Sequence, residues 1–235
     1  MGECHGLFIT GTDTGVGKTY VGAMIARQLA AQGRRVGVYK PAASGCRRQG
    51  SQTVSDDALC LWEAAGRPAD GDHVCPQRFL APLAPPVAAR AEARQVDPQL
   101  LRTGLRYWLD RSDVVLVEGV GGLFSPISEK DLVADLAADF GFPLLIVSRN
   151  VLGTINQTLL TVAAARSFRT ELLVVGIVLN HPAAPADDES LSTNAQELAR
   201  WCHVPILAQV GWQAQQFDRA VDWFSLARPG LYPAG

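Results

Sequence analysis

A glycine-rich loop near the amino terminus carries the residue types that bind phosphate. It is the segment GTDTGVGKT at positions 11–19. Gly15 and Gly17 have no Cβ, so backbone N–H groups can close around phosphate oxygens. Lys18 is spaced to reach the β- and γ-phosphates, and the Thr19 hydroxyl can bind Mg²⁺. The loop therefore predicts a nucleotide-phosphate site.

The flanking segments place this loop between a strand and a helix. Residues 6–10 form an apolar run typical of a buried strand. Val21, Ile25 and Leu29 follow at four-residue spacing, which predicts an amphipathic helix that stops at Gly33. Such a helix start supports an anion through its dipole and its free N–H groups. A glycine-rich turn with an incidental lysine is the alternative.

The loop departs from the strict G-x-x-x-x-G-K-[ST] pattern. Thr12 stands where that pattern needs its first glycine, and a glycine comes one residue earlier. Asp13 stands where the partition-type ATPases have a second lysine. These differences indicate a subclass of phosphate-binding enzymes.

Length and composition favour one α/β domain over residues 1–235, working in the cytoplasm. A formal charge of −2 gives no general attraction to nucleic acid or to acidic membranes. The chain has no apolar stretch of membrane-spanning length and no signal-peptide pattern. Its five cysteines are scattered without a C-x-x-C pair, as expected of reduced thiols.

Apolar, β-rich runs alternate with helical patterns along the whole chain. Near-continuous Val, Ile and Leu runs are typical of parallel strands covered on both faces. The pattern predicts a doubly wound, mostly parallel sheet with helices on both faces, and ligands at the carboxyl ends of its strands. Further strands are expected at 35–40, 114–118, 144–147, 172–179 and 205–210, and helices near 56–66, 98–110, 131–139, 153–168 and 187–201.

Acidic residues near two of these boundaries are candidate Mg²⁺ ligands. Glu118 ends a hydrophobic run and precedes a glycine-rich segment, where a second contact to Mg²⁺ is expected. A solvated glutamate opening a turn is the alternative. Asp56 and Asp57 begin a predicted helix, where one of them can serve simply as the N-cap. The other can complete an oxygen set with Thr19 and Glu118.

Lys40 and Asn180 also end predicted strands. Lys40, followed by Pro41, can neutralise charge on a substrate or on a moving phosphoryl group; an ordinary surface lysine is the alternative. The Asn180 amide can recognise a base edge or cap a turn. The four histidines have no metal-ligand spacing, and the five tryptophans are interpreted as packing residues, with Trp212 able to serve either purpose.

Together these residues resemble the dethiobiotin synthetase family, which closes the ring of dethiobiotin at the expense of ATP. The resemblance runs in order from residue 6 to about residue 215 and is carried by the phosphate loop and five later stretches. These are YKPAASG at 39–45, SDDAL at 55–59, VEGVGGLFSP at 117–126, LGTIN at 152–156 and the Asn180 strand end.

The resemblance implies a role for each matching position. Lys40 and Lys18 would be catalytic, and the ion held by Thr19, Asp57 and Glu118 would be Mg²⁺. Thr14, Lys40 and Ser44 would contact substrate, as would Gly153, Thr154 and Asn156 from the partner of a homodimer. ATP would be bound by Gly15, Val16, Gly17, Lys18, Thr19, Asp57, Glu118, Gly119, Val120, Gly121, Asn180, His181, Val210, Gly211 and Trp212, with Asn180 and the last three near the adenine.

The implied substrates are 7,8-diaminopelargonate, CO₂ and ATP. One amine becomes a carbamate, the carbamate takes the γ-phosphoryl group, and the second amine displaces phosphate to close the ureido ring. Lysines and Mg²⁺ suit such a transfer, because it chiefly needs alignment and charge neutralisation. No nucleic acid or membrane partner is expected.

Four positions depart from the family pattern and bear on affinity and base selectivity. Gly15 stands where some relatives have glutamate, and His181 where aspartate is usual. Gly211 replaces a proline, and Ala84 lies where a serine can meet substrate.

Two other functions fit a phosphate loop. A nucleotide-switched assembly protein of the partition or metal-insertion type is disfavoured by Asp13 and by the lack of a basic patch or amphipathic tail. A cobyrinate-type amidating synthetase would need a glutaminase domain or its own ammonia supply.

Overall fold

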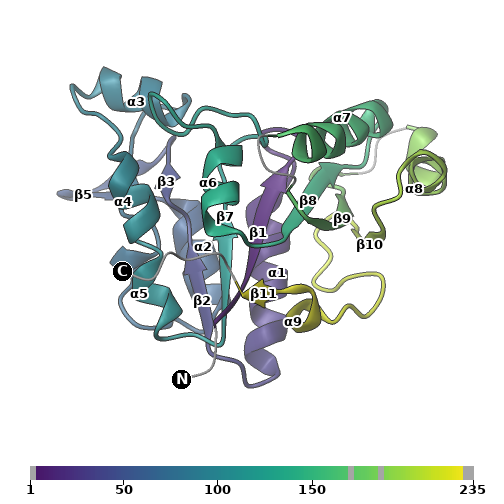
Figure 1. The fold of residues 1–235 in the computed structure, drawn as a ribbon, viewed down its shortest axis with the longest axis horizontal. Coiled ribbons are helices and arrows are strands. Elements are labelled where there is room, and N and C mark those ends of the chain that lie inside the picture. Colours follow the sequence, from purple (N-terminus) through teal and green to yellow (C-terminus); the bar gives the residue numbers. More distant parts are fainter. Residues whose placement is uncertain (1–3, 169–171, 185–187, 230–235) are drawn as a thin grey trace.

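A parallel sheet forms the centre of the protein, with helices on both of its faces (Figure 1). The computed structural model describes residues 4–168, 172–184 and 188–229. The main strands lie in the order β10-β9-β8-β1-β7-β2, and each neighbouring pair is parallel. They are β1 (His5–Gly11), β2 (Val36–Tyr39), β7 (Val114–Glu118), β8 (Leu144–Arg149), β9 (Val174–Asn180) and β10 (Ile206–Val210). The α/β architecture expected from the sequence is confirmed.

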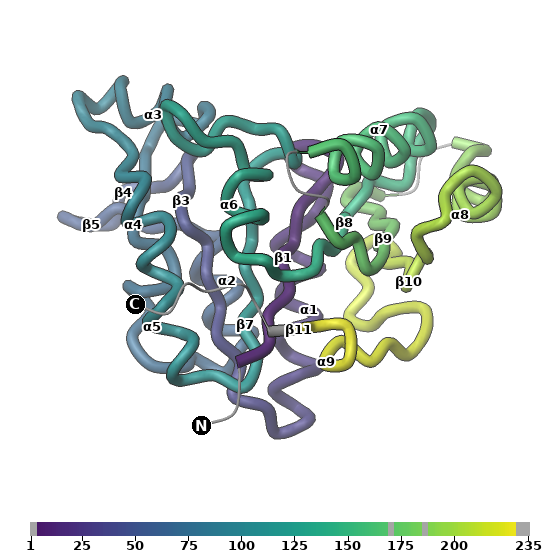
Figure 2. The backbone as a smooth tube through the Cα atoms, in the orientation of Figure 1, coloured from purple at the N-terminus to yellow at the C-terminus, as the bar shows by residue number. Residues whose placement is uncertain are grey.

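Helices α1 and α2 cover one face of the sheet, and α6 and α7 cover the other (Figures 1 and 2). The predicted first helix is present as α1, which begins after Gly17 and ends before Gly33. The other helices start and end within a few residues of their expected bounds, apart from the segment 98–110. The helices are α1 (Lys18–Ala31), α2 (Asp56–Ala64), α3 (Pro85–Ala91), α4 (Pro98–Thr103), α5 (Arg106–Leu109), α6 (Val133–Phe140), α7 (Thr154–Ser167), α8 (Ser190–Trp201) and α9 (Trp223–Leu226).

Short elements that the sequence analysis did not predict complete the fold. Strand β11 adds to the sheet antiparallel to the first residues of β1, with His5 opposite Pro229. Two small sheets and one 3₁₀ turn lie outside the central sheet. They comprise β3 (Ala42–Ala43) with β6 (Gln77–Arg78), β4 (Arg47–Gln49) with β5 (Gln52–Val54), and the turn Gly71–His73.

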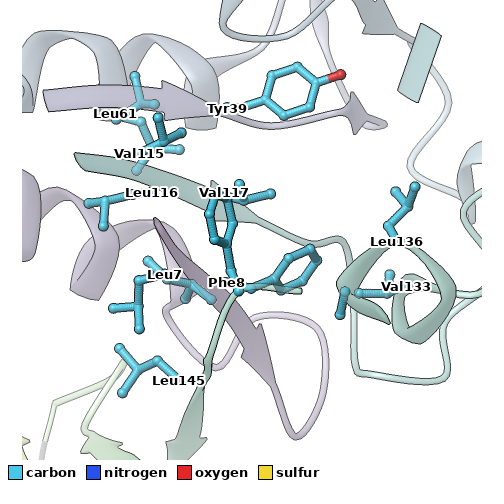
Figure 3. Close-up of a cluster of buried hydrophobic side chains, with 14 of the residues drawn as sticks. Leu7, Phe8, Tyr39, Leu61, Val115, Leu116, Val117, Val133, Leu136 and Leu145 are labelled. Atoms are coloured by element: carbon cyan, nitrogen blue, oxygen red, sulfur yellow. The ribbon is translucent and has the colours of Figure 1, made fainter. Parts of the chain in front are cut away.

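The core consists of side chains that alternate between the two faces of the central strands (Figure 3). Phe8 of β1 points toward α6, and its ring and the Val133 side chain both border the space beside Gly119. Ile9, one residue later, points to the opposite side and approaches Gly22 of α1. Both faces of β1 are therefore apolar, which explains the unbroken hydrophobic run in its sequence.

The expected helix 98–110 is wrong as a single element, because it divides into α4 and α5. The buried Tyr39 hydroxyl donates hydrogen bonds to the carbonyls of Leu100 and Leu101, at 3.1 and 2.9 Å. A Cβ at Gly104 would lie 2.5 Å from that hydroxyl oxygen. Tyr39 thus bonds to the Leu101 carbonyl, which a continuous helix would pair with the N–H of residue 105, while the Leu100 carbonyl also accepts from Gly104 N at 3.0 Å. The glycine at position 104 leaves room for the Tyr39 hydroxyl.

We expect Gly6→Ala to destabilise the protein by about 1–3 kcal/mol, as overpacking in a filled core does. A Cβ at this position of β1 would lie 2.1 Å from the ring of Phe142. Denaturant unfolding followed by circular dichroism measures the change. Gly211→Ala is the matched control, since its Cβ would meet nothing closer than Ala214 at 3.8 Å. Equal stability of the two variants would contradict this packing analysis.

Candidate functional site

The carboxyl ends of β1, β2 and β7 meet around a cavity of about 370 Å³. Neighbouring parallel strands end at the same edge of a sheet, so residues distant in sequence converge there. The cavity is lined by Thr14, Gly15, Gly17, Lys18, Thr19, Tyr20, Lys40, Ala43, Ser44, Asp57, Glu118, Val120 and Gly121. The candidates from the phosphate loop, from β2 and from β7 therefore share one site.

Lys40 is a buried cation held between two carboxylates. Its Nζ lies 2.5 Å from Glu118 Oε1 and 2.9 Å from Asp57 Oδ2, and its side chain is 4 % exposed. Burial lowers the pKa of Lys40, but the two carboxylates outweigh burial and hold the pKa above its ordinary value. The interpretation as an ordinary surface lysine is therefore wrong, and the ammonium stays charged at neutral pH.

Glu118 is buried at the end of β7 and has one carboxylate oxygen without a partner. Oε1 accepts hydrogen bonds from Lys40 and, at 2.8 Å, from the Thr19 hydroxyl. Oε2 is buried and makes no hydrogen bond. The interpretation as a solvated glutamate is wrong, because the residue is 1 % exposed. A buried, unpaired carboxylate oxygen beside a hydroxyl fits a hard cation such as Mg²⁺.

Asp57 faces this cluster from the first turn of α2. Ser55, not either aspartate, caps the helix, since its hydroxyl accepts a hydrogen bond from Ala58 N at 3.2 Å. Asp56 points elsewhere and pairs with Arg47. Burial raises the pKa of Asp57, but the opposing effect of the Lys40 charge and hydrogen bond is larger, so the net shift of the pKa is downward. Asp57 is thus an anionic oxygen donor next to Glu118. Among the described residues, this site included, no group of three or more His, Cys, Asp or Glu side chains is placed to hold a metal ion.

Lys18 is buried at the start of α1 and folds back over the phosphate loop. Its Nζ donates a hydrogen bond to the carbonyl oxygen of Asp13 at 2.9 Å. Burial lowers the pKa of Lys18 to about 8, with Glu118 opposing that shift and Lys40 adding to it. The ammonium is therefore less fully charged above neutral pH than an ordinary lysine, and a bound anion would favour its protonated form.

Both glycines of the phosphate loop are required by the backbone, and Gly17 also by a neighbouring side chain. Gly15 and Gly17 have φ values of 71° and 95°, which L-residues rarely adopt. A Cβ on Gly17 would also lie 2.0 Å from Asn180 Nδ2. Asn180 donates a hydrogen bond to the carbonyl of Val16 at 2.8 Å, and its buried Oδ1 has no partner. The end of β9 thus contacts the phosphate loop directly.

The remaining predicted residues lie outside this cavity. Val16 and Gly119 are beside it, and Val210 lies opposite Asn180 at the end of β10, followed by Gly211 and Trp212. His181 lines a second cavity, of about 250 Å³, that shares the wall at Gly15. Gly153, Thr154 and Asn156 lie at the start of α7, away from the lining of the main cavity.

Two lining residues were missed by the sequence analysis, Tyr20 and Ala43. Tyr20 directly follows the phosphate loop, and that adjacency was the available signal. Ala43 lies within the stretch 39–45 that carries part of the resemblance, but an alanine side chain has no chemistry that would have singled it out.

Curated relatives decide the family. An ATP-dependent dethiobiotin synthetase from Rhodopirellula baltica is 48 % identical over 86 % of this chain and 82 % of its own length. One from Anaeromyxobacter dehalogenans is 44 % identical, with 92 % and 94 % covered, and one from Bacillus subtilis is 38 % identical, with 86 % and 85 % covered. The chain belongs to the dethiobiotin synthetase family. Residues 5–217 also match a family model described as an AAA domain.

Solved structures with related folds are more distant from this dethiobiotin synthetase family member. The pNOB8 ParA structure bound to nonspecific DNA has a TM-score of 0.55 at 12 % identity and covers 94 % of this chain and 90 % of its own. A ParA family ATPase from Chlorobium tepidum has a TM-score of 0.54 at 15 % identity, with 90 % and 84 % covered. These likenesses support the phosphate-loop α/β fold. No helix within the described ranges is long and apolar enough to cross a membrane.

We expect the affinity for MgADP to fall as the pH rises above about 8, the pKa of Lys18 in the free protein. A bound phosphate favours the charged ammonium, so the affinity is complete below this pKa. It then decreases by up to roughly tenfold per pH unit until the pKa of the complex is passed. Isothermal calorimetry between about pH 7 and about pH 9.5 measures this dependence.

Lys18→Arg provides the control for that titration, since a guanidinium stays charged over the whole range. Calorimetry in two buffers of different ionisation enthalpy should show proton uptake by the wild-type protein and none by the variant. A flat pH profile in the wild-type protein would contradict the assignment to Lys18.

Proposed function

We propose that this protein is a cytoplasmic, ATP-dependent ligase that forms dethiobiotin from 7,8-diaminopelargonate, CO₂ and ATP, as a step of biotin synthesis. In the proposed reaction one amine is carboxylated to a carbamate, and a carbamate oxygen attacks the γ-phosphorus of ATP with release of ADP. The second amine then attacks the carbamate carbon, and phosphate leaves as the ureido ring closes. The observation that carries the proposal is Lys40, charged and buried between Glu118 and Asp57 beside the phosphate loop.

The two lysines of the cavity have distinct proposed roles. Lys18 holds the β- and γ-phosphates within the loop, because its ammonium reaches back across the loop to Asp13. Lys40 approaches from β2 and neutralises charge on the phosphoryl group as it moves to the carbamate. Its carboxylate partners keep it protonated, so it acts through its charge and does not serve as a base.

Thr19, Glu118 and Asp57 would hold Mg²⁺ at the entrance of the phosphate loop. The unpaired Glu118 Oε2 supports this proposal, as does the close approach of the Thr19 hydroxyl to the same carboxylate. The ion would supply positive charge to the phosphate oxygens when bound. Lys40 bonds to the other oxygen of this carboxylate, Oε1.

The nucleotide and the organic substrate are proposed to meet at the phosphate loop. Gly15 to Thr19 and the segment 119–121 would surround the phosphates, and Asn180, His181 and the segment 210–212 would lie near the base. Thr14 and Ser44, which line the cavity with Lys40, would contact the diamine.

A homodimer is part of the proposal. The start of α7 lies outside the lining of its own subunit's cavity, and Gly153 and Asn156 are exposed there, whereas the Thr154 side chain is buried against Ser148. The partner subunit's Gly153, the partner subunit's Thr154 and the partner subunit's Asn156 would then bind the substrate carboxylate, as the free N–H groups of a helix start favour.

The product assay tests the proposal directly. Purified protein is given diaminopelargonate, bicarbonate and MgATP, and dethiobiotin and ADP are quantified by mass spectrometry and a coupled assay. We expect the two products in equal amounts. Folded protein that forms no dethiobiotin would reject the ligase.

A nucleotide-switched assembly protein is the alternative, and the ParA-like fold is the observation that favours it. Asp13 in place of the second lysine opposes it. Size-exclusion chromatography separates the two functions. A dimer that forms without nucleotide supports the ligase, whereas dimerisation that requires ATP supports the assembly protein.

We expect Lys40→Ala to lower kcat by roughly 10²–10³-fold while changing the KM for ATP much less, because the charge matters most when the phosphoryl group moves. Steady-state kinetics measures both constants. The third lysine of the chain, Lys130, is exposed, and Lys130→Ala is the control.

The same change leaves Glu118 as a buried charge without its cation, so some loss of stability is also expected. Circular dichroism and thermal unfolding show whether the variant is folded at the assay temperature. Lys40→Arg, which keeps the charge, serves as a second variant with an expected intermediate kcat. An unchanged kcat in folded Lys40→Ala would exclude a role in the chemical step.

A further inference from the structure

The segment after β10 runs along one side of α1. Tyr20 donates a hydrogen bond to the carbonyl of Ala214 at 2.6 Å. Two turns later, Gln28 donates to the carbonyl of Val221 at 3.2 Å and accepts from the indole N–H of Trp223 at 3.0 Å. Residues eight positions apart lie on the same face of a helix. The first helix therefore fastens the carboxyl-terminal segment at two points.

The loop of residues 211–218, here named the β10 loop, is also fixed at its base. The backbone of Gln209 donates to Asp218 Oδ1 at 2.6 Å, and the backbone N–H of Asp218 donates to the Gln209 carbonyl at 3.1 Å. Within the loop, Gln213 has φ = 54°, a conformation that costs a non-glycine residue about 1 kcal/mol or more. Such a conformation persists only where the surrounding contacts define it.

The β10 loop starts next to the strand end that contacts the phosphate loop. Val210 lies opposite Asn180 in the sheet and accepts a hydrogen bond from His181 N at 2.9 Å. Asn180 in turn bonds to Val16 of the phosphate loop. A nucleotide whose phosphates occupy the main cavity therefore has the β10 loop beside it. Trp212 of this loop has a large aromatic side chain that is 44 % exposed.

We infer that Tyr20 is a positioning residue for nucleobase binding, which acts by holding the β10 loop against the start of α1. The inference rests on the nucleotide site of the proposed function, and it does not depend on which reaction that site performs. Tyr20 lines the phosphate cavity, while its hydroxyl reaches the loop. It thus joins the wall around the phosphates to the wall around the base.

In this arrangement, the contacts to the phosphates and the contacts to the base contribute separately to nucleotide affinity. Contacts to the phosphates come from the glycine loop, Lys18 and Thr19, and they do not pass through the β10 loop. Contacts to the base depend on the position of that loop. Removing the Tyr20 hydroxyl should therefore weaken the binding of ligands that have a base and leave the affinity for ligands that have only phosphates unchanged.

The experiment compares Tyr20→Phe with wild-type protein for three ligands, MgADP, MgGDP and magnesium tripolyphosphate, by isothermal calorimetry. We expect the Kd for MgADP to rise roughly three- to tenfold, the effect of one lost hydrogen bond. The preference for ADP over GDP should fall, and the Kd for tripolyphosphate should stay within about twofold. Tyr107→Phe is the matched control, because its hydroxyl accepts a hydrogen bond from the backbone N–H of Asp70 and does not line the cavity.

Two outcomes would overturn the inference. An equal loss for MgADP and tripolyphosphate would mean that Tyr20 acts on the phosphate loop itself, and an unchanged Kd for MgADP would mean that it has no role in binding. Because all three measurements are of binding, absence of dethiobiotin in the product assay would reject the ligase without deciding this point.

A double-mutant cycle tests whether Tyr20 acts through the loop. Trp212→Ala removes an exposed side chain of the β10 loop, so this variant is expected to fold. If Tyr20 positions that side chain, the double variant will lose less ADP affinity than the sum of the two single losses, because part of each loss is shared. Simple additivity would contradict the proposed route.

Discussion

The site depends on the buried ion pair between Lys40 and Glu118. Each side chain is almost fully removed from water, so each is costly without the other. The pair also connects two strands, since Lys40 follows β2 and Glu118 ends β7, its neighbour in the sheet. Thr19 and Asp57 bond to the same two residues and bring in α1 and α2. One electrostatic contact thereby organises four elements around the mouth of the phosphate loop.

The order of the strands explains why these elements meet. β1 lies at the centre of the sheet, between β7 and β8, so the loop that follows it is bordered on both sides by strand ends. Glu118 approaches from β7, and Asn180 reaches the loop from β9, beyond β8. The glycine at position 17 is needed because that asparagine occupies the space of a Cβ. The phosphate loop is thus shaped by its neighbours as well as by its own sequence.

Residues at strand ends were predictable from the sequence, and residues fixed by distant contacts were not. Lys40 and Glu118 each follow an apolar run, and in a parallel sheet those ends converge. Tyr20 bonds to a residue 194 positions later, a contact that has no local signal. The break between α4 and α5 likewise depends on Tyr39, about sixty residues earlier in the chain. Asp57 was open between capping and ion binding, because only the structure shows that Ser55 fills the cap.

The charge of the cavity sets what it can bind. Lys18 and Lys40 contribute two positive charges, and Asp57 and Glu118 contribute two negative ones. The net charge of these four side chains is therefore close to zero. The two carboxylates also pair with the Lys40 ammonium and neutralise its charge before any ligand binds. A triphosphate therefore gains little from these side chains alone, and the backbone N–H groups of the loop must supply the rest of the attraction. A divalent cation at Glu118 would change this balance, because it would neutralise the carboxylates and leave Lys40 free to act on the phosphoryl group.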